Sequence, residues 1–154
     1  MYSSFSLIIS ALILSLVTLL ISLTICGQIS ILRGVKIRRK RGNWDLNRLN
    51  TVIISPVVEE ILFRGIFYEW VLSLDMNNKE KLFIIVSGGV FALLHNYSNL
   101  KQLIEKFCVG GIIYSHIFLW NKNLFLVIMV HVFHNLFVVY LTESYLEGAD
   151  CGGK

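Results

Sequence analysis

A long run without any charge opens the chain and sets the first limit on its fold. From Phe5 to Cys26 no residue is charged, and such a run of about 22 residues is long enough for a helix to cross the hydrocarbon core of a bilayer. The chain as a whole is 55% hydrophobic, more than a water-soluble domain usually contains. A signal peptide would need a basic start and a shorter apolar run, and the residues before Phe5 include no lysine or arginine. We therefore expect a multi-pass membrane protein.

Apolar runs recur along the rest of the chain, with short polar turns between them. Only helices or closed barrels satisfy the backbone in lipid, and these runs lack the period-two alternation of barrel strands. The expected fold is an all-α bundle of about five transmembrane helices. Residues 1–48 would hold the first helix and a basic loop, residues 49–143 a helical core, and residues 144–154 a disordered tail. The five expected spans are residues 5–26, 49–74, 82–94, 103–120 and 124–141.

Basic residues gather directly after the first apolar run, between Arg33 and Arg41. Such a cluster can bind nucleic acid, but next to a span it is more typical of a cytoplasmic loop. It can also contact anionic lipid head groups. We expect a protein of the cell membrane with its N-terminus outside and its C-terminus in the cytoplasm, in contact with membrane lipids and without a nucleic-acid partner. The three cysteines show no metal-ligand spacing and no even-numbered disulfide framework.

Three ionisable residues interrupt the second apolar run, where each is expensive to hold. A charged side chain at the centre of a spanning helix costs about 2.5–3.5 kcal/mol on insertion scales, so such residues are candidates for a functional site. Glu60 and Arg64 are four residues apart and can pair on one helix face, whereas Glu59 points about 100° away. Pro56, one turn earlier, has no N–H and leaves the carbonyl of Val52 without its usual partner.

Histidines and an asparagine occupy corresponding depths in other segments. His95 ends the third apolar run, and His131 and Asn135 share one face of the last. At 1.5 Å per residue, Glu59, His95, His131 and Asn135 lie roughly 10–20 Å from the cytoplasmic face, within about 5 Å of the midplane of a 30 Å core. Residues with unrelated structural roles have no reason to agree in depth. The sequence therefore predicts one hydrated site near the bilayer midplane.

Two kinds of chemistry suit these residues. Glu59, His95 and His131 could bind zinc, which would lower the pKa of a bound water. Alternatively, Glu59 and His95 could deprotonate a water directly as general bases. His131 and Asn135 would then donate hydrogen bonds to the oxyanion of a tetrahedral intermediate. Asn135 is a poor zinc ligand and a good amide donor, which favours the second arrangement without deciding the metal.

Three short motifs in this order resemble those of the CAAX-protease and bacteriocin-processing (CPBP) family. They are "EEILFRG" from Glu59, "FALLH" ending at His95, and "HVFHN" from His131 to Asn135. The family patterns are E-E-x-x-x-R, F-x-x-x-H and H-x-x-x-N or H-x-x-x-D, and the resemblance covers about residues 52–139.

The resemblance implies an intramembrane endopeptidase whose catalytic core is residues 49–143. Glu59 and His95 would activate water, His131 and Asn135 would form a second pair, and Glu60 and Arg64 would support the site. The substrate would be a peptide or a lipidated protein. Members of this family trim prenylated proteins or are linked to peptide maturation and to bacteriocin self-immunity, and they have been discussed both with and without a catalytic metal.

Two functions without proteolysis also suit such a chain. A membrane immunity protein could sequester a toxin peptide without turnover, and its protection would survive loss of Glu59. A small transporter could use Glu59 and the histidines as a proton path, although the chain shows no inverted repeat.

Overall fold

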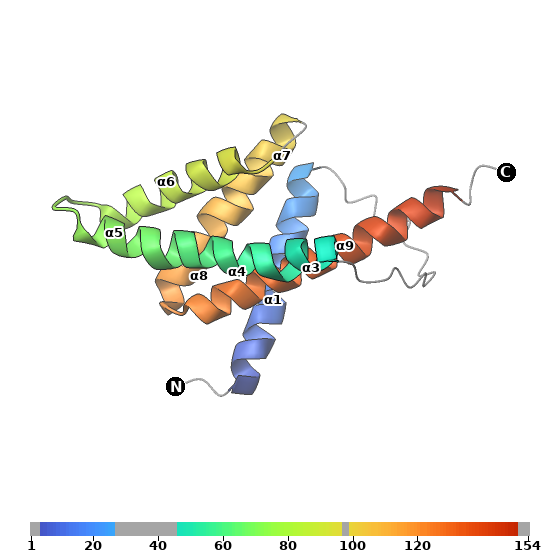
Figure 1. Ribbon diagram of the computed structural model, residues 1–154, viewed down its shortest axis with the longest axis horizontal. Coiled ribbons are helices and arrows are strands. Elements are labelled where there is room, and N and C mark those ends of the chain that lie inside the picture. Colours follow the sequence, from blue (N-terminus) through green and yellow to red (C-terminus); the bar gives the residue numbers. More distant parts are fainter. Residues whose placement is uncertain (1–3, 27–45, 97–98, 151–154) are drawn as a thin grey trace.

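The computed structural model describes residues 4–26, 46–96 and 99–150, and places side chains for residues 6–25, 46–96 and 99–141. These residues form five helical rods, of which the second and fourth combine α-helical and π-helical pieces without a break (Figure 1). No strand occurs among the described residues. In chain order the rods are α1 (Ser4–Cys26); α3 (Leu46–Leu49), η1 (Asn50–Ile54), α4 (Ser55–Glu60), η2 (Ile61–Phe67) and α5 (Tyr68–Ser73); α6 (Lys79–Leu94); α7 (Leu100–Glu105), η3 (Lys106–Ile113) and α8 (Tyr114–Asn121); and α9 (Leu124–Asp150).

The five rods follow the five apolar runs, and the predicted all-α fold of a membrane protein is confirmed. Within the described residues, three helical stretches are long and apolar enough to cross a membrane: Ser6–Ile25, Leu100–Asn121 and Leu124–Leu141. The second rod carries charges near its middle, and α6 has only 16 residues. The basic segment between Arg33 and Arg41 lies outside the described residues.

The rods pack around a core to which most of them contribute. The second rod contacts α9 through η1, α4 and η2, while α1 crosses α9 (Figure 1). Helix α6 packs closely on η3, because Gly88 and Gly111 bring the two backbones together; a Cβ on Gly111 would overlap the Cα of Gly88. Apolar side chains fill the centre, among them Val71, Phe83, Tyr114, Val127 and Val130.

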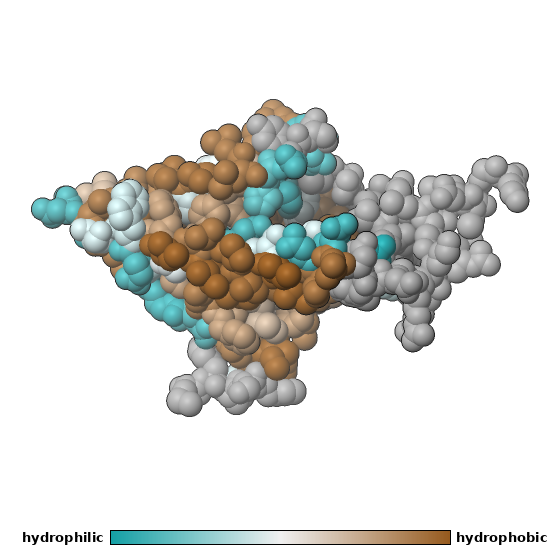
Figure 2. Space-filling view, viewed as in Figure 1, coloured by the Kyte–Doolittle hydropathy of each residue, from teal (hydrophilic) through white to brown (hydrophobic). Residues whose placement is uncertain are grey.

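Apolar side chains also cover much of the outside, as expected where the solvent is lipid. Many large apolar residues are exposed, for example Ile13 on α1, Ile85 on α6 and Phe125 on α9. Figure 2 shows brown, apolar surface across most of the described part in this view, with hydrophilic residues at the turn between α5 and α6 and in a patch near the centre.

The π-helical pieces matter because they change which carbonyl oxygens have a backbone partner. In η1 the N–H of Ser55 donates to the carbonyl of Asn50, five residues back, and the next residue is Pro56, which has no N–H. At the end of η3 the N–H of Tyr114 donates to the carbonyl oxygens of Val109 and Gly111 and not to that of Gly110. Single π-helical turns within α-helices are frequent at functional sites.

Helix α9 continues further than the sequence indicates. Its backbone is helical to Asp150, so residues 144–150 extend the helix although a disordered tail was expected from residue 144. Once a helix has been nucleated and held by packing, each added residue gains a hydrogen bond, which lets it extend beyond the apolar run. Residues 151–154 lie outside the described residues.

Candidate active site

A buried ion pair forms the base of the site. Arg64 on η2 and Glu60 on α4 make the predicted i, i+4 pair, with Nη1 3.2 Å from Oε2, and both side chains have 0% exposure. The other terminal nitrogen of Arg64 donates to the carbonyl oxygens of Gly110 and Gly111, the latter at 3.3 Å, and lies 3.5 Å from Oγ of Ser115. The carbonyl of Gly110 is the one that does not accept from Tyr114 N–H, its usual α-helical donor. The π-helical piece η3 therefore supplies an acceptor for the guanidinium.

Glu59 lies where three rods meet. Its Oε2 is 3.7 Å from Nε2 of His95, at the end of α6, and 3.8 Å from Nε2 of His131, on α9. These distances exceed a direct hydrogen bond, and Glu59 Oε2 is a buried atom without a hydrogen-bond partner in the described structure. The side chains of Glu59 and His95 are 23% and 27% exposed, while that of His131 is 7% exposed. Glu59 and His95 are thus the accessible members of this group.

His95 is held in one orientation by its own helix. Its Nδ1 lies 2.7 Å from the carbonyl oxygen of Phe91, and the imidazole stacks on the Phe91 ring with 4.2 Å between centroids. A carbonyl only accepts hydrogen bonds, so Nδ1 must carry the proton. In the neutral tautomer Nε2 is then an acceptor, and it faces Glu59.

His131 connects the two glutamates. Its Nδ1 is 2.8 Å from Oε1 of Glu60, and its Nε2 faces Glu59. The carboxylate of Glu60 accepts a hydrogen bond from Nδ1–H and so fixes the imidazole ring, as carboxylates do for functional histidines in other proteins. The ring also packs on Tyr114, with 4.9 Å between centroids.

Asn135 has a partner that the sequence analysis does not anticipate. It lies one turn after His131 on α9, and its Nδ2 donates to the carbonyl oxygen of Thr51 at 3.1 Å. Thr51 belongs to η1, two turns before Glu59 on the second rod. The structure thus joins Arg64, Glu60, His131, Glu59 and His95 through successive contacts in that order. Asn135 contacts the second rod about two helical turns before Glu59.

Polar residues outside the fixed positions of the three motifs also lie in the interior of the bundle. His134 is 95% buried and its Nδ1 lies 3.1 Å from Oγ1 of Thr18 on α1. Glu105 is also buried and accepts a hydrogen bond of 2.7 Å from Ser22. Ser15, Thr18 and Ser22 are spaced i, i+3 and i+7 in a run without charge, and this spacing is the signal that would have revealed a polar face on α1.

Whether Glu59, His95 and His131 bind zinc stays a prediction. Among the described residues, no group of three or more histidine, cysteine, aspartate or glutamate side chains is arranged so that it could hold a metal ion. Glu59, His95 and His131 do approach each other, but through one carboxylate oxygen that both imidazoles face at more than 3.5 Å.

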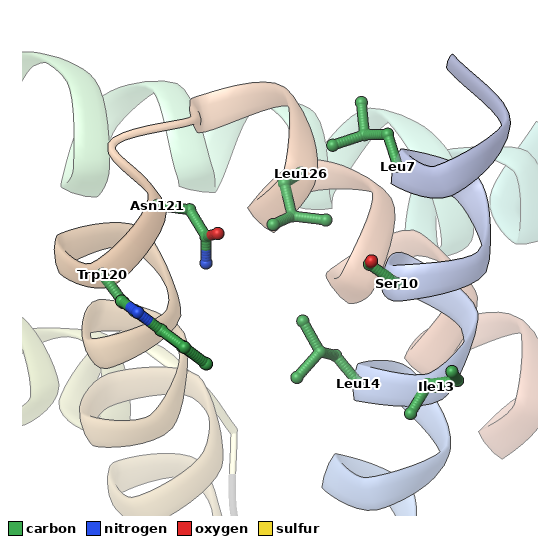
Figure 3. A pocket seen from close by; sticks show the side chains of 7 residues that line it. All are labelled: Leu7, Ser10, Ile13, Leu14, Trp120, Asn121 and Leu126. Carbon is green, nitrogen blue, oxygen red and sulfur yellow. The ribbon is translucent and has the colours of Figure 1, made fainter. Parts of the chain in front are cut away.

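Two cavities lie away from this centre. One of about 410 Å³ opens between α1, α8 and α9, where Trp120 and Asn121 face Ser10 and Leu14 (Figure 3). Another of about 350 Å³ lies between α6 and the fourth rod, lined by Gly89, Ala92, Leu93, Leu103, Ile104 and Phe107. Neither is lined by a charged residue, so neither replaces the glutamate–histidine centre as the candidate active site.

The fold and this centre define a class: a helical membrane protein with a buried carboxylate–histidine site shared by three rods. The family model described as "Type II CAAX prenyl endopeptidase Rce1-like" matches residues 41–137, well over half of the chain. The chain therefore belongs to this family, and the resemblance inferred from the three motifs is confirmed.

A curated relative supports the same assignment. The chain is 34% identical over 90 residues to the "Membrane-embedded CAAX protease MroQ" of Staphylococcus aureus (strain USA300), an alignment that covers 56% of this chain and 35% of the relative. The chain thus spans about a third of that protein's length. No solved structure matches the chain.

Proposed function

We propose that the chain is a membrane-embedded endopeptidase that hydrolyses a peptide bond with a water activated by Glu59 and His95. The observation that supports this most directly is the meeting of Glu59 with the Nε2 atoms of His95 and His131, from three rods, at 3.7 and 3.8 Å. A water molecule can bridge polar groups that are more than 3.5 Å apart. Membership of the CAAX endopeptidase family agrees with this chemistry.

The hydrogen-bonding capacities of the two side chains explain why water would be activated here. An ionised Glu59 only accepts, and neutral His95 presents Nε2 as an acceptor because its Nδ1 proton goes to Phe91. Two acceptors this close to each other require a shared donor, and a water molecule beside them can donate one O–H to each. Either group can then take a proton as the water oxygen attacks the carbonyl carbon. General base catalysis of this kind contributes about 10²–10⁴-fold to the rate.

His131 and Asn135 would stabilise the oxyanion that forms in this attack. When protonated, His131 can donate from Nε2, and Glu60 keeps the ring in place through Nδ1. Asn135 has a second amide N–H besides the one directed at Thr51. Glu60 and Arg64, both fully buried, would support the site by positioning His131 and would not touch the substrate.

The substrate would be a peptide or a lipidated protein that reaches the site from the cytoplasmic side. This follows from the proposed orientation, in which the basic segment between Arg33 and Arg41 is cytoplasmic and the N-terminus is outside. Peptide processing and bacteriocin self-immunity are both roles that such an enzyme could serve. CAAX peptides are the appropriate first substrates, because the matched relative is described as a CAAX protease.

The test is cleavage of farnesylated and unmodified CAAX peptides by the purified protein in detergent, with products identified by mass spectrometry. Glu59→Gln and His95→Ala should each lower turnover by about 10²-fold or more. Glu69→Gln and His116→Ala are matched controls, because both residues are exposed on the described surface, and they should retain wild-type rates. Turnover should also survive incubation with a chelator; loss of activity that returns with added zinc would assign the reaction to a metal instead.

Full activity in Glu59→Gln would refute the proposed mechanism. A wild-type protein that cleaves neither peptide but binds one of them, with binding unchanged in Glu59→Gln, would favour the alternative of a non-catalytic membrane immunity or binding protein.

A further inference from the structure

The carbonyl oxygen of Thr51 has neither its α-helical donor, four residues on, nor its π-helical donor, five residues on. The donor four residues on is Ser55 N–H, which is directed at Asn50 instead. The donor five residues on, which a π-helical turn would use, is Pro56, and proline has no N–H. Pro56 is the chain's only proline and is fully buried. A backbone carbonyl within a membrane protein needs a partner.

Asn135 supplies that partner from another helix. Its Nδ2 donates to Thr51 at 3.1 Å, so one N–H of the amide is fixed by the second rod. The amide plane is thereby oriented, and the direction of the second N–H is set with it. The same arrangement occurs at the base of the site, where the Gly110 carbonyl accepts from Arg64 after Tyr114 N–H has passed over it. In both places a π-helical piece presents a carbonyl to a side chain of the active-site motifs.

We propose that Pro56 is a positioning residue for the active site: because it lacks an N–H, it leaves the Thr51 carbonyl to Asn135 and thereby aims the Asn135 amide. A residue with an N–H at this position would donate to the Thr51 carbonyl at π-helical spacing. It would compete with Asn135 for that carbonyl, and the Asn135 side chain would no longer be fixed. The catalytic part of this inference rests on the proposed function, in which Asn135 donates to the oxyanion. The structural part, that residues 56 and 135 share one acceptor, does not.

The shared acceptor is tested by a double-mutant cycle on thermal stability, with wild type, Pro56→Ala, Asn135→Ala and the double variant in detergent. In the wild-type background Asn135→Ala removes the side-chain hydrogen bond to the Thr51 carbonyl, and the melting midpoint should fall by roughly 4 °C. In the Pro56→Ala background the N–H of residue 56 donates to the Thr51 carbonyl, so Asn135→Ala should lower the midpoint by less than half as much. Equal falls in the two backgrounds would overturn the inference, whatever the activity of the protein.

Kinetics test the positioning role. Pro56→Ala should lower kcat about 10- to 100-fold with KM nearly unchanged, and in the Asn135→Ala background it should change kcat by less than about threefold, since the effect acts through Asn135. Pro56→Val also restores an N–H but fills more of the space of the ring, and it should behave like Pro56→Ala. Ile54→Ala, an exposed change on the same rod, is the control.

The outcomes separate the two proposals. An active wild type with unchanged kcat in Pro56→Ala would refute the positioning role while leaving the endopeptidase intact. A wild type that does not cleave the CAAX peptides would count against the proposed function, and the stability cycle would still decide whether Pro56 and Asn135 share Thr51.

Discussion

Removal of the Arg64 side chain gives the most direct measure of what holds the site together. In Arg64→Met the carboxylate of Glu60 stays fully buried without its cationic partner and keeps only the hydrogen bond from His131 Nδ1, and the carbonyls of Gly110 and Gly111 lose a donor. Removal of one member of a buried ion pair typically costs about 3–5 kcal/mol. At about 2–4 °C per kcal/mol for a chain of this size, the melting midpoint should fall by roughly 6–20 °C.

The double variant Glu60→Gln/Arg64→Met provides the critical comparison. It removes both charges, so no uncompensated carboxylate remains in the interior, and buried pairs replaced as a whole are often nearly neutral. Its midpoint should therefore lie above that of Arg64→Met alone. The assay is thermal unfolding of detergent-purified protein, followed by tryptophan fluorescence. A double variant less stable than Arg64→Met would refute the view that unpaired charge dominates the loss.

Two further predictions concern packing around the site, each with a control substitution of the same type and each read from the melting midpoint in detergent. Gly111→Ala should destabilise the protein by about 1–3 kcal/mol or more, because its Cβ would overlap the Gly88 backbone; Gly89→Ala, with open space around the added Cβ, should not. Thr18→Val should cost about 1–3 kcal/mol by leaving His134 Nδ1 without its partner. Thr24→Val is its exposed control, and an equal loss in the two threonine variants would contradict this reasoning.

Much of the fold could be predicted because lipid makes helix boundaries visible in sequence. The apolar runs end where polar turns begin, and the five rods follow them within a few residues except at the C-terminal end of α9. The pairing of Glu60 with Arg64 follows from helix geometry alone. Agreement in depth was enough to anticipate that Glu59, His95 and His131 would meet.

The π-helical turns and the burial of Glu105 depend on residues distant in the sequence, so they are harder to predict from it. A π-helical turn is a change of hydrogen-bond register, and a side-chain donor such as Asn135 can satisfy the carbonyl that it frees. The sequence places a missing N–H near Val52, yet the carbonyl that gains a side-chain partner is that of Thr51. The burial of Glu105 likewise depends on Ser22 from α1, about eighty residues earlier in the chain.

The charges of the second rod also bear on how the protein is made. This rod is not among the three stretches able to span a bilayer by length and composition, and it holds Glu59, Glu60 and Arg64 near its middle. Glu60 and Arg64 can neutralise each other as soon as the helix forms, but His131 and Asn135 are synthesised some seventy residues later, on the last helix. The second rod is therefore expected to remain at the translocon until α9 has been synthesised, and to insert into the lipid together with α9. Ribosome-bound chains that end before Leu124 should keep it accessible to aqueous reagents.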